Sequence, residues 1–144
     1  MLIGKNPLNE APEWFVKNIA ERPEECSVHV NGANVQYFIW GDKSKKPLLL
    51  LHGYNAHSFW WDHIAPSLTE NHCVVGLDFS GMGESDRREV YSQEIFVDDV
   101  KGVIDDLSWK SCTCIAHSMG GSIATLATSI YPDIFDHLIL LDSM

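Results

Sequence analysis

Two kinds of hydrophobic pattern follow one another along the chain. From residue 27 to residue 40, apolar and polar positions alternate on both sides of Asn31-Gly32, a pair that favours the positive backbone angles of a tight hairpin turn. Continuous apolar runs then take over, at residues 48–52, 73–78, 113–117 and 138–142. A strand with such a run is buried on both faces, as in a parallel sheet covered by helices. The pattern predicts an antiparallel hairpin followed by four buried parallel strands.

Helical segments separate these strands. The spacing of apolar residues predicts helices over residues 12–22, 58–68, 92–107 and 119–131. Ser58 and Ser92 are suited to cap two of them, and Pro132 stops the last. Alternation of apolar strand and helix requires right-handed crossovers, so the fold class is α/β, a mostly parallel sheet with helices on both faces.

Composition narrows the classes of function. The 144 residues include 10 Lys plus Arg against 20 Asp plus Glu, and a formal charge of −10 argues against nucleic acid and anionic membranes as partners. No window approaches the roughly 18 apolar residues of a membrane span, and residues 1–7 lack the apolar core of a signal peptide. Four cysteines without metal-ligand spacing indicate reduced thiols and a cytoplasmic protein. We expect no metal and no cofactor.

A candidate nucleophile lies between the third buried run and the helix after it. Ser118 sits in an A-x-S-x-G arrangement, close to the G-x-S-x-G nucleophile elbow. A sharp strand-to-helix turn would expose the serine oxygen and leave room only for small residues two positions away, here Ala116 and Gly120. We therefore expect a sparsely populated backbone conformation at Ser118, at a cost of about 1–3 kcal/mol.

Two further motifs close the preceding strands, His52-Gly53 after the first apolar run and a D-x-x-G-x-G-x-S stretch within residues 78–86 after the second. Together with the elbow, in this order and spacing, they resemble the α/β-hydrolase superfamily, in its branch of serine esterases and C–C hydrolases. The resemblance implies that residues 27–144 are the N-terminal half of an α/β-hydrolase core domain, truncated after the sixth strand. Residues 1–26 would be an N-terminal helical segment.

The resemblance also implies roles for particular residues. The backbone amides of Tyr54 and Met119 would form the oxyanion hole beside Ser118. Asp78 would shape a loop without a catalytic role. Serine at position 118 argues against epoxide hydrolases and haloalkane dehalogenases, which use aspartate there. The family places its triad acid and then its histidine on later strands, so both are expected outside this chain.

Side chains within the chain are alternatives for the missing roles. His117 flanks the serine, but neighbours on a strand point to opposite faces. His52 and His57 lie on the oxyanion loop, where bracing the loop is the simpler interpretation. Asp142 ends the last strand near the site, where a minority of the family places its acid.

Two clusters of large side chains have more than one interpretation. The aromatic run Phe59-Trp60-Trp61 either lines a substrate pocket or packs the start of a helix against the sheet. Arg87-Arg88 is expected in a solvated loop.

Three functions stay open at this point. The first is a serine hydrolase that cleaves a small carboxylic ester through an acyl-enzyme on Ser118, completed by a second chain, by the other piece of a nicked polypeptide or by an omitted segment. The second is a C–C bond hydrolase or lyase on the same scaffold, and the third is a non-catalytic relative that acts as a binding module. We expect the strand order 1-2-4-3-5-6, with only the first hairpin antiparallel to the rest. The last strand should be covered by a complementary C-terminal half or by self-association, because an apolar sheet edge is prone to aggregate.

Overall fold

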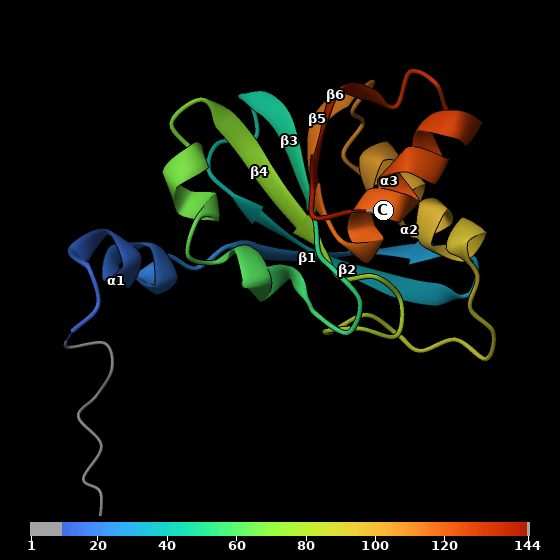
Figure 1. The fold of residues 1–144 in the computed structure, drawn as a ribbon, viewed down its shortest axis with the longest axis horizontal. Helices are drawn as coiled ribbons and strands as arrows, with labels where there is room; N and C mark the ends of the chain where they lie inside the picture. The colour runs from blue at the N-terminus through green and yellow to red at the C-terminus, as the bar shows by residue number, and fades with distance from the viewer. Residues whose placement is uncertain (1–9, 144) are drawn as a thin grey trace, which may run out of the picture.

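A six-stranded sheet organises residues 10–143, the part of the chain that the computed structural model describes (Figure 1). The strands are β1 (Glu24–Val30), β2 (Ala33–Trp40), β3 (Lys46–Leu51), β4 (His72–Leu77), β5 (Cys112–His117) and β6 (Phe135–Leu141). They lie in the order β1-β2-β4-β3-β5-β6, which confirms the predicted order. β1 starts ahead of residue 27, the expected start of the core domain, while residues 1–9 and Met144 lie outside the described residues.

The hairpin forms as predicted, but its first strand runs in an unexpected direction. Asn31 and Gly32 both have positive φ, 44° and 85°, and Val30 pairs with Ala33 across the two-residue turn. β2 is antiparallel to β1 on one side and to β4 on the other, and the remaining pairings are parallel. Because β2 is antiparallel to both β1 and β4, β1 is parallel to β4 and to the remaining strands. β2 is therefore the one antiparallel strand of the sheet. The expected direction is therefore right for β2 and wrong for β1.

Helices cover the two faces of the sheet unequally. α2 (Gln93–Asp106) and α3 (Met119–Ile130) pack on one face, over the larger apolar cluster (Figure 1). The other face buries a smaller cluster that includes Phe38, Trp40 and Trp61. Because neighbouring residues of a strand point to opposite faces, the continuous apolar runs of β3, β4 and β5 supply both clusters at once.

The helix predicted over residues 58–68 is wrong: two 3-10 turns, η2 (Ser58–Trp61) and η3 (Ala65–Leu68), take its place. Ser58 is not a cap, because its backbone N–H and its hydroxyl both donate to the buried carboxylate of Asp78. Pro66 also lacks the N–H that a continuous α-helix would use at this point. A contact with a distant strand end thus decides the local conformation.

The other predicted helices form. α1 (Glu13–Ala20) is fastened beside η3 by its buried Asn18, whose amide donates to the carbonyl oxygen of His63 at 2.8 Å and to the hydroxyl of Ser67 at 2.6 Å. Ser92 caps α2 as predicted, since its hydroxyl accepts a hydrogen bond of 3.3 Å from the third residue of the helix. No helix in the described part of the chain has the length and apolar character that crossing a membrane requires.

Three of the four cysteines behave as small core residues. Cys73, Cys112 and Cys114 are buried, Cys26 is partly exposed, and all are free thiols. Burial raises the pKa of Cys112 to about 12 and raises that of Cys114 as well. Thiols held in the neutral form are poor nucleophiles and poor metal ligands.

β6 lies at one edge of the sheet, as predicted, and pairs with β5. Ile139, Leu140 and Leu141 expose 47%, 47% and 41% of their surface, although neighbouring side chains point to opposite faces. The prediction of a strand buried on both faces is therefore wrong for the second half of β6, whereas Leu138 packs against the larger apolar cluster.

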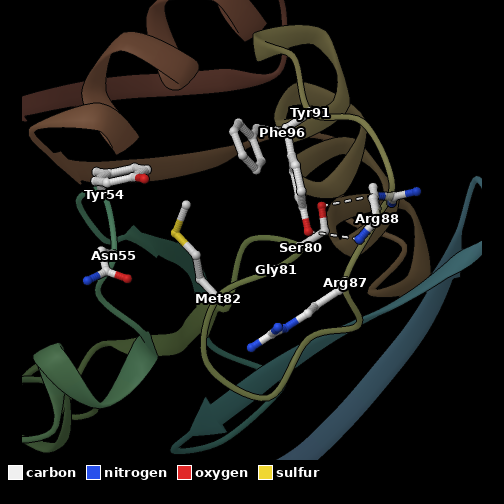
Figure 2. A pocket seen from close by; sticks show the side chains of 9 residues that line it. All are labelled: Tyr54, Asn55, Ser80, Gly81, Met82, Arg87, Arg88, Tyr91 and Phe96. Carbon is white, nitrogen blue, oxygen red and sulfur yellow. Dashed lines mark hydrogen bonds between the residues drawn. The ribbon is translucent and has the colours of Figure 1, made fainter.

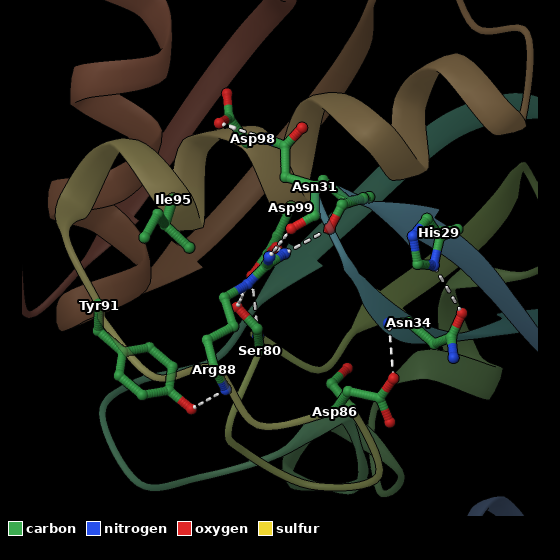
Figure 3. Close-up of polar contacts among 12 residues, drawn as sticks. His29, Asn31, Asn34, Ser80, Asp86, Arg88, Tyr91, Ile95, Asp98 and Asp99 are labelled. Carbon is green, nitrogen blue, oxygen red and sulfur yellow. Dashed lines mark hydrogen bonds and ion pairs between the residues drawn. The ribbon is translucent and has the colours of Figure 1, made fainter.

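Arg88 contradicts the expectation of a solvated loop at Arg87-Arg88. Its side chain is 9% exposed and forms an ion pair of 3.0 Å with the fully buried Asp99 of α2. The guanidinium also donates to the carbonyl oxygens of Val30 and Asn31, each at 2.8 Å (Figure 3). The sequence pattern gave no sign of this pairing because its members come from three separate segments.

Ser80 completes the cluster around Arg88. Its backbone N–H and its hydroxyl donate to Asp99 at 2.8 Å and 2.6 Å, and the hydroxyl accepts a bond of 2.9 Å from Arg88 Nε. Burial raises the pKa of Asp99, while the hydrogen bonds from Ser80 and Arg88 act in the opposite direction. The cluster joins the hairpin turn, the loop after β4 and α2, and so fixes that loop at the carboxyl edge of the sheet.

We expect Arg88→Met to lower the free energy of unfolding by about 3 kcal/mol, because it leaves the Asp99 carboxylate buried without its cation. Urea denaturation of the chain measures this. Arg87→Met is the matched control, since it removes the same charge from the exposed neighbour and should change stability by less than about 0.5 kcal/mol. Equal losses for the two variants would contradict the structural role given to Arg88.

Candidate active site

Ser118 has the strained backbone predicted for a nucleophile elbow. It joins β5 to α3 with φ 51° and ψ −120°, a conformation that side chains other than glycine rarely adopt. Ala116 is fully buried, and a Cβ at Gly120 would lie 2.6 Å from the carbonyl oxygen of His52. The start of α3 therefore presses against the end of β3, and only small residues fit at these two positions.

Ser118 faces a shallow cavity of about 190 Å³ at the carboxyl edge of the sheet. Gly53, Tyr54, Trp60 and His117 are among the residues that line it. The structure thus brings Ser118 and the segment that contains Tyr54 to one cavity, although they come from different loops.

Met119 is the first residue of α3, directly after Ser118. The first N–H groups of a helix have no carbonyl partner within it, and the helix dipole places partial positive charge there. An oxyanion that forms on a substrate bound to Ser118 would meet this end of the helix.

His52 braces the loop that follows β3, termed the oxyanion loop for the role that the resemblance implies for Tyr54. Its ring is fully buried, with Nδ1 2.7 Å from the carbonyl oxygen of Gly53 and Nε2 3.2 Å from the backbone nitrogen of Phe79. Since the Phe79 N–H can only donate, Nε2 is the acceptor and Nδ1 carries the proton that is donated to Gly53. Burial lowers the pKa of His52, which favours this neutral ring. Both ring nitrogens are occupied, so the ring serves as a brace and not as a base.

Asp78 and its glycine-containing loop form a second brace. The buried carboxylate accepts hydrogen bonds from Ser58 and from the Glu84 N–H, the latter at 2.8 Å. Gly83 has φ 53°, and a Cβ there would overlap the Asp78 carboxylate. Ser85 is the last residue of the motif. Its hydroxyl donates to the Asp78 carbonyl oxygen at 2.6 Å and accepts a hydrogen bond from the backbone N–H of Gln36 in β2. The motif thus shapes a loop at the site.

The remaining candidates for base and acid lie near Ser118 but do not bond to it. His117 shares the cavity with Ser118, contrary to the expectation of opposite faces, because the sharp turn at the elbow rotates the serine out of the strand pattern. The His117 ring stacks on Trp60, with centroids 5.7 Å apart and planes at 14°. Asp142 is exposed at the end of β6, with φ 46°. Within residues 10–143 no histidine ring hydrogen-bonds to the Ser118 hydroxyl.

The aromatic run divides between the two interpretations. Trp60 is 53% exposed and lines the cavity of Ser118. Trp61 is buried in the smaller core cluster, and Phe59 packs against that cluster. One of the three aromatic residues is therefore available to a substrate, and two support the sheet.

A larger cavity of about 520 Å³ adjoins the oxyanion loop and was not foreseen from the sequence. Figure 2 shows the rings of Tyr54, Phe96 and Tyr91 around it, with Met82 between them and Arg87 extended along the loop. Its lining comes from the loop after β3, the loop after β4 and the start of α2. No local sequence motif therefore predicts this cavity. Within the described residues, no group of three or more His, Cys, Asp or Glu side chains could hold a metal ion.

Comparison with known proteins agrees with this geometry. The alpha/beta hydrolase fold family matches residues 46–144. A serine hydrolase-like protein of Mus musculus is 34% identical over 124 residues, which cover 83% of this chain and 39% of the relative. Epoxide hydrolase 4 of Mus musculus is 33% identical over 122 residues, covering 81% of this chain and 34% of the relative.

Solved structures show the same relation. A membrane phospholipase A described as a bacterial virulence factor superposes with a TM-score of 0.82 at 29% identity, over 90% of this chain and 42% of that one. The 2-hydroxy-6-oxo-6-phenylhexa-2,4-dienoate hydrolase of Rhodococcus sp. strain RHA1 gives a TM-score of 0.75 at 26% identity, over 85% and 47%. The chain thus spans less than half the length of these relatives.

We expect the neutral ring of His52 to make stability depend on pH. A histidine whose pKa is lowered on folding contributes fully above its unfolded pKa of about 6.5, and this contribution is lost as the pH falls toward the folded pKa. The free energy of unfolding should therefore fall between about pH 7 and 5.5, by up to ~1.4 kcal/mol per pH unit from this residue. Urea denaturation across this range should give a shallower slope for His52→Gln. His137→Gln, an exposed control on β6, should keep the original slope, and equal slopes for all three proteins would contradict the role of His52.

Proposed function

The chain belongs to the alpha/beta hydrolase fold family, and from that premise we propose that it is the N-terminal part of a serine hydrolase that cleaves a small carboxylic ester. The observation that carries the proposal is the backbone of Ser118, held at φ 51° and ψ −120° between β5 and α3. Such strain persists only where the surrounding structure enforces it, and Ser118 lines the cavity beside Tyr54.

The chemistry follows from this placement. The Ser118 oxygen attacks the ester carbonyl, and the carbonyl oxygen becomes an oxyanion that the N–H groups of Tyr54 and Met119 stabilise. A base takes the serine proton during the attack and passes it to the departing alcohol when the intermediate collapses. The acyl group left on Ser118 is then released by water as the carboxylic acid. The neutral brace of His52 keeps the loop of Tyr54 in place during these steps.

Serine at position 118 favours acyl transfer over the reaction that names the epoxide hydrolase relatives. A hydroxyl is a weak nucleophile and needs a base within about 3 Å. We propose that this base, a histidine, and an acid that orients it belong to a complementary C-terminal part of the same hydrolase. Asp142, exposed beside the carboxyl end of β5, is the alternative source of the acid.

The bare edge at β6 supports a complementary part. Apolar side chains on an edge strand are unfavourable in water. They are stabilised when a further strand pairs with the edge and its helices cover both faces. We therefore propose that β6 pairs with the C-terminal part of the hydrolase, or with a second copy of this chain when that part is missing.

We expect the 144-residue chain alone to hydrolyse p-nitrophenyl acetate at a negligible rate, indistinguishable from its Ser118→Ala variant, because no base activates the serine. A stopped assay of p-nitrophenol release measures this. Addition of a complementary C-terminal half from a family member should produce turnover that Ser118→Ala abolishes. Robust Ser118-dependent turnover by the isolated chain would instead show that a base lies within it.

We also expect the isolated chain to self-associate through β6. Light scattering after size-exclusion chromatography should give a mass above the 16.2 kDa of one chain. Leu140→Lys, which places a charge on the exposed edge, should shift the protein toward the monomer. If the unsubstituted chain is a soluble monomer, the proposed self-association through β6 is wrong.

A further inference from the structure

The cavity of about 520 Å³ beside the oxyanion loop has an unusual balance of charge. Its lining includes Arg87 and Arg88 and no acidic residue, in a chain with 20 Asp plus Glu against 10 Lys plus Arg. The cavity between the ends of α2 and α3 differs, because Asp105 and Asp133 accompany its two lysines. The cavity beside the oxyanion loop therefore combines positive charge with an absence of competing carboxylates.

The two arginines are not equivalent. The guanidinium of Arg88 is occupied by its ion pair with Asp99 and by hydrogen bonds to the carbonyl oxygens of the hairpin turn. Arg87 forms no hydrogen bond or ion pair with another described residue. Ser80 is likewise occupied by the cluster, whereas the Asn55 side chain has no partner within residues 10–143. The groups left to hold a ligand are the Arg87 guanidinium and the Asn55 amide.

The rest of the wall is apolar and firmly held. Tyr91 stacks on Phe96 with ring centroids 5.9 Å apart, and Phe96 packs edge-on against the buried Phe79 at 5.4 Å. The Tyr91 hydroxyl accepts a 2.8 Å bond from the Arg88 N–H, and a Cβ at Gly81 would overlap that hydroxyl. The Arg88 cluster thus fixes an aromatic wall opposite Tyr54, as Figure 2 shows.

Tyr54 borders both this cavity and the smaller one that contains Ser118. A ligand whose reacting carbonyl lies at Ser118 can therefore extend past Tyr54 toward Tyr91 and Arg87. About 520 Å³ lies within the usual range of small-molecule sites.

We propose that this cavity binds the part of the substrate remote from the scissile ester, and that this part is an apolar or aromatic group ending in a carboxylate held by Arg87. The proposal rests on the proposed function, whose substrate class it narrows to esters that carry a second, free carboxylate. Guanidinium binds carboxylate through two parallel N–H donors, which gives both affinity and orientation. Tyr91, Phe96 and Met82 would pack against the apolar spacer.

The test uses a pair of non-reactive probes of the same shape, 4-phenylbutyrate and its neutral amide, titrated into the full 144-residue chain. Backbone amide shifts in NMR spectra locate the bound probe. We expect the carboxylate to perturb Met82, Tyr91 and Phe96 and to bind about tenfold or more tightly than the amide. Perturbation centred on Lys101 and Lys110 instead, or equal affinity for both probes, would overturn the proposal.

Variants isolate the contribution of Arg87. Arg87→Met should weaken carboxylate binding about tenfold and leave amide binding unchanged, while Arg87→Lys should fall between, since it keeps the charge but loses the paired donors. Arg22→Met is the matched control, an exposed arginine outside the cavity whose loss changes the net charge equally. Equal weakening by Arg87→Met and Arg22→Met would show only a general effect of charge and would overturn the proposal. Neither probe is an ester, so this result is independent of whether Ser118 acts as a nucleophile.

Discussion

The close approach of α3 to the end of β3 is the constraint on which the site depends. At Gly120 the helix backbone comes so near to the carbonyl oxygens of Leu51 and His52 that no side chain fits between them. The chain can enter the helix at this distance only through a sharp turn, and Ser118 takes the positive φ that the turn demands. The same contact places the first N–H groups of α3 beside the loop that follows β3, so one packing requirement positions both Ser118 and the backbone amides proposed as oxyanion donors.

Three buried titratable residues hold the loops around that contact. His52 braces the oxyanion loop, Asp78 holds the glycine-containing loop to η2, and Asp99 holds the next stretch through Ser80 and Arg88. Burial of a polar group costs free energy unless its hydrogen bonds are satisfied, and each of these side chains has two or more partners. The carboxyl edge of the sheet is therefore a network of fixed polar contacts, which suits a site whose donors must not move while charge develops.

The end of the sheet at β6 has fewer such contacts. β6 adds a full parallel pairing to β5 but leaves apolar side chains in water on both faces, and Asp142 stands exposed at its end. Ser118 accordingly has strain, a cavity and adjacent helix amides, but no hydrogen-bonded base among residues 10–143. The C-terminal part proposed above would supply both a neighbour for this edge and a base for the serine, because in a parallel sheet each further strand brings a further loop to the carboxyl edge.

The order of the strands follows from the resemblance that the motifs carry. The sequence by itself determined the strands, the hairpin turn, the cap at Ser92 and the strained elbow at Ser118. Each follows from hydrophobic periodicity or from residues adjacent in the chain, and such signals act over a few positions. Tertiary structure decided what depends on residues far apart: the 3-10 turns that serve Asp78, the direction of β1 and the rotation of Ser118 into the cavity of His117. Tertiary structure also gave different environments to Arg87 and Arg88, two identical residues that are adjacent in the sequence. Arg88 lies against Asp99 and the hairpin turn, whereas Arg87 borders a cavity without carboxylates, and only the packing of three distant segments creates that difference.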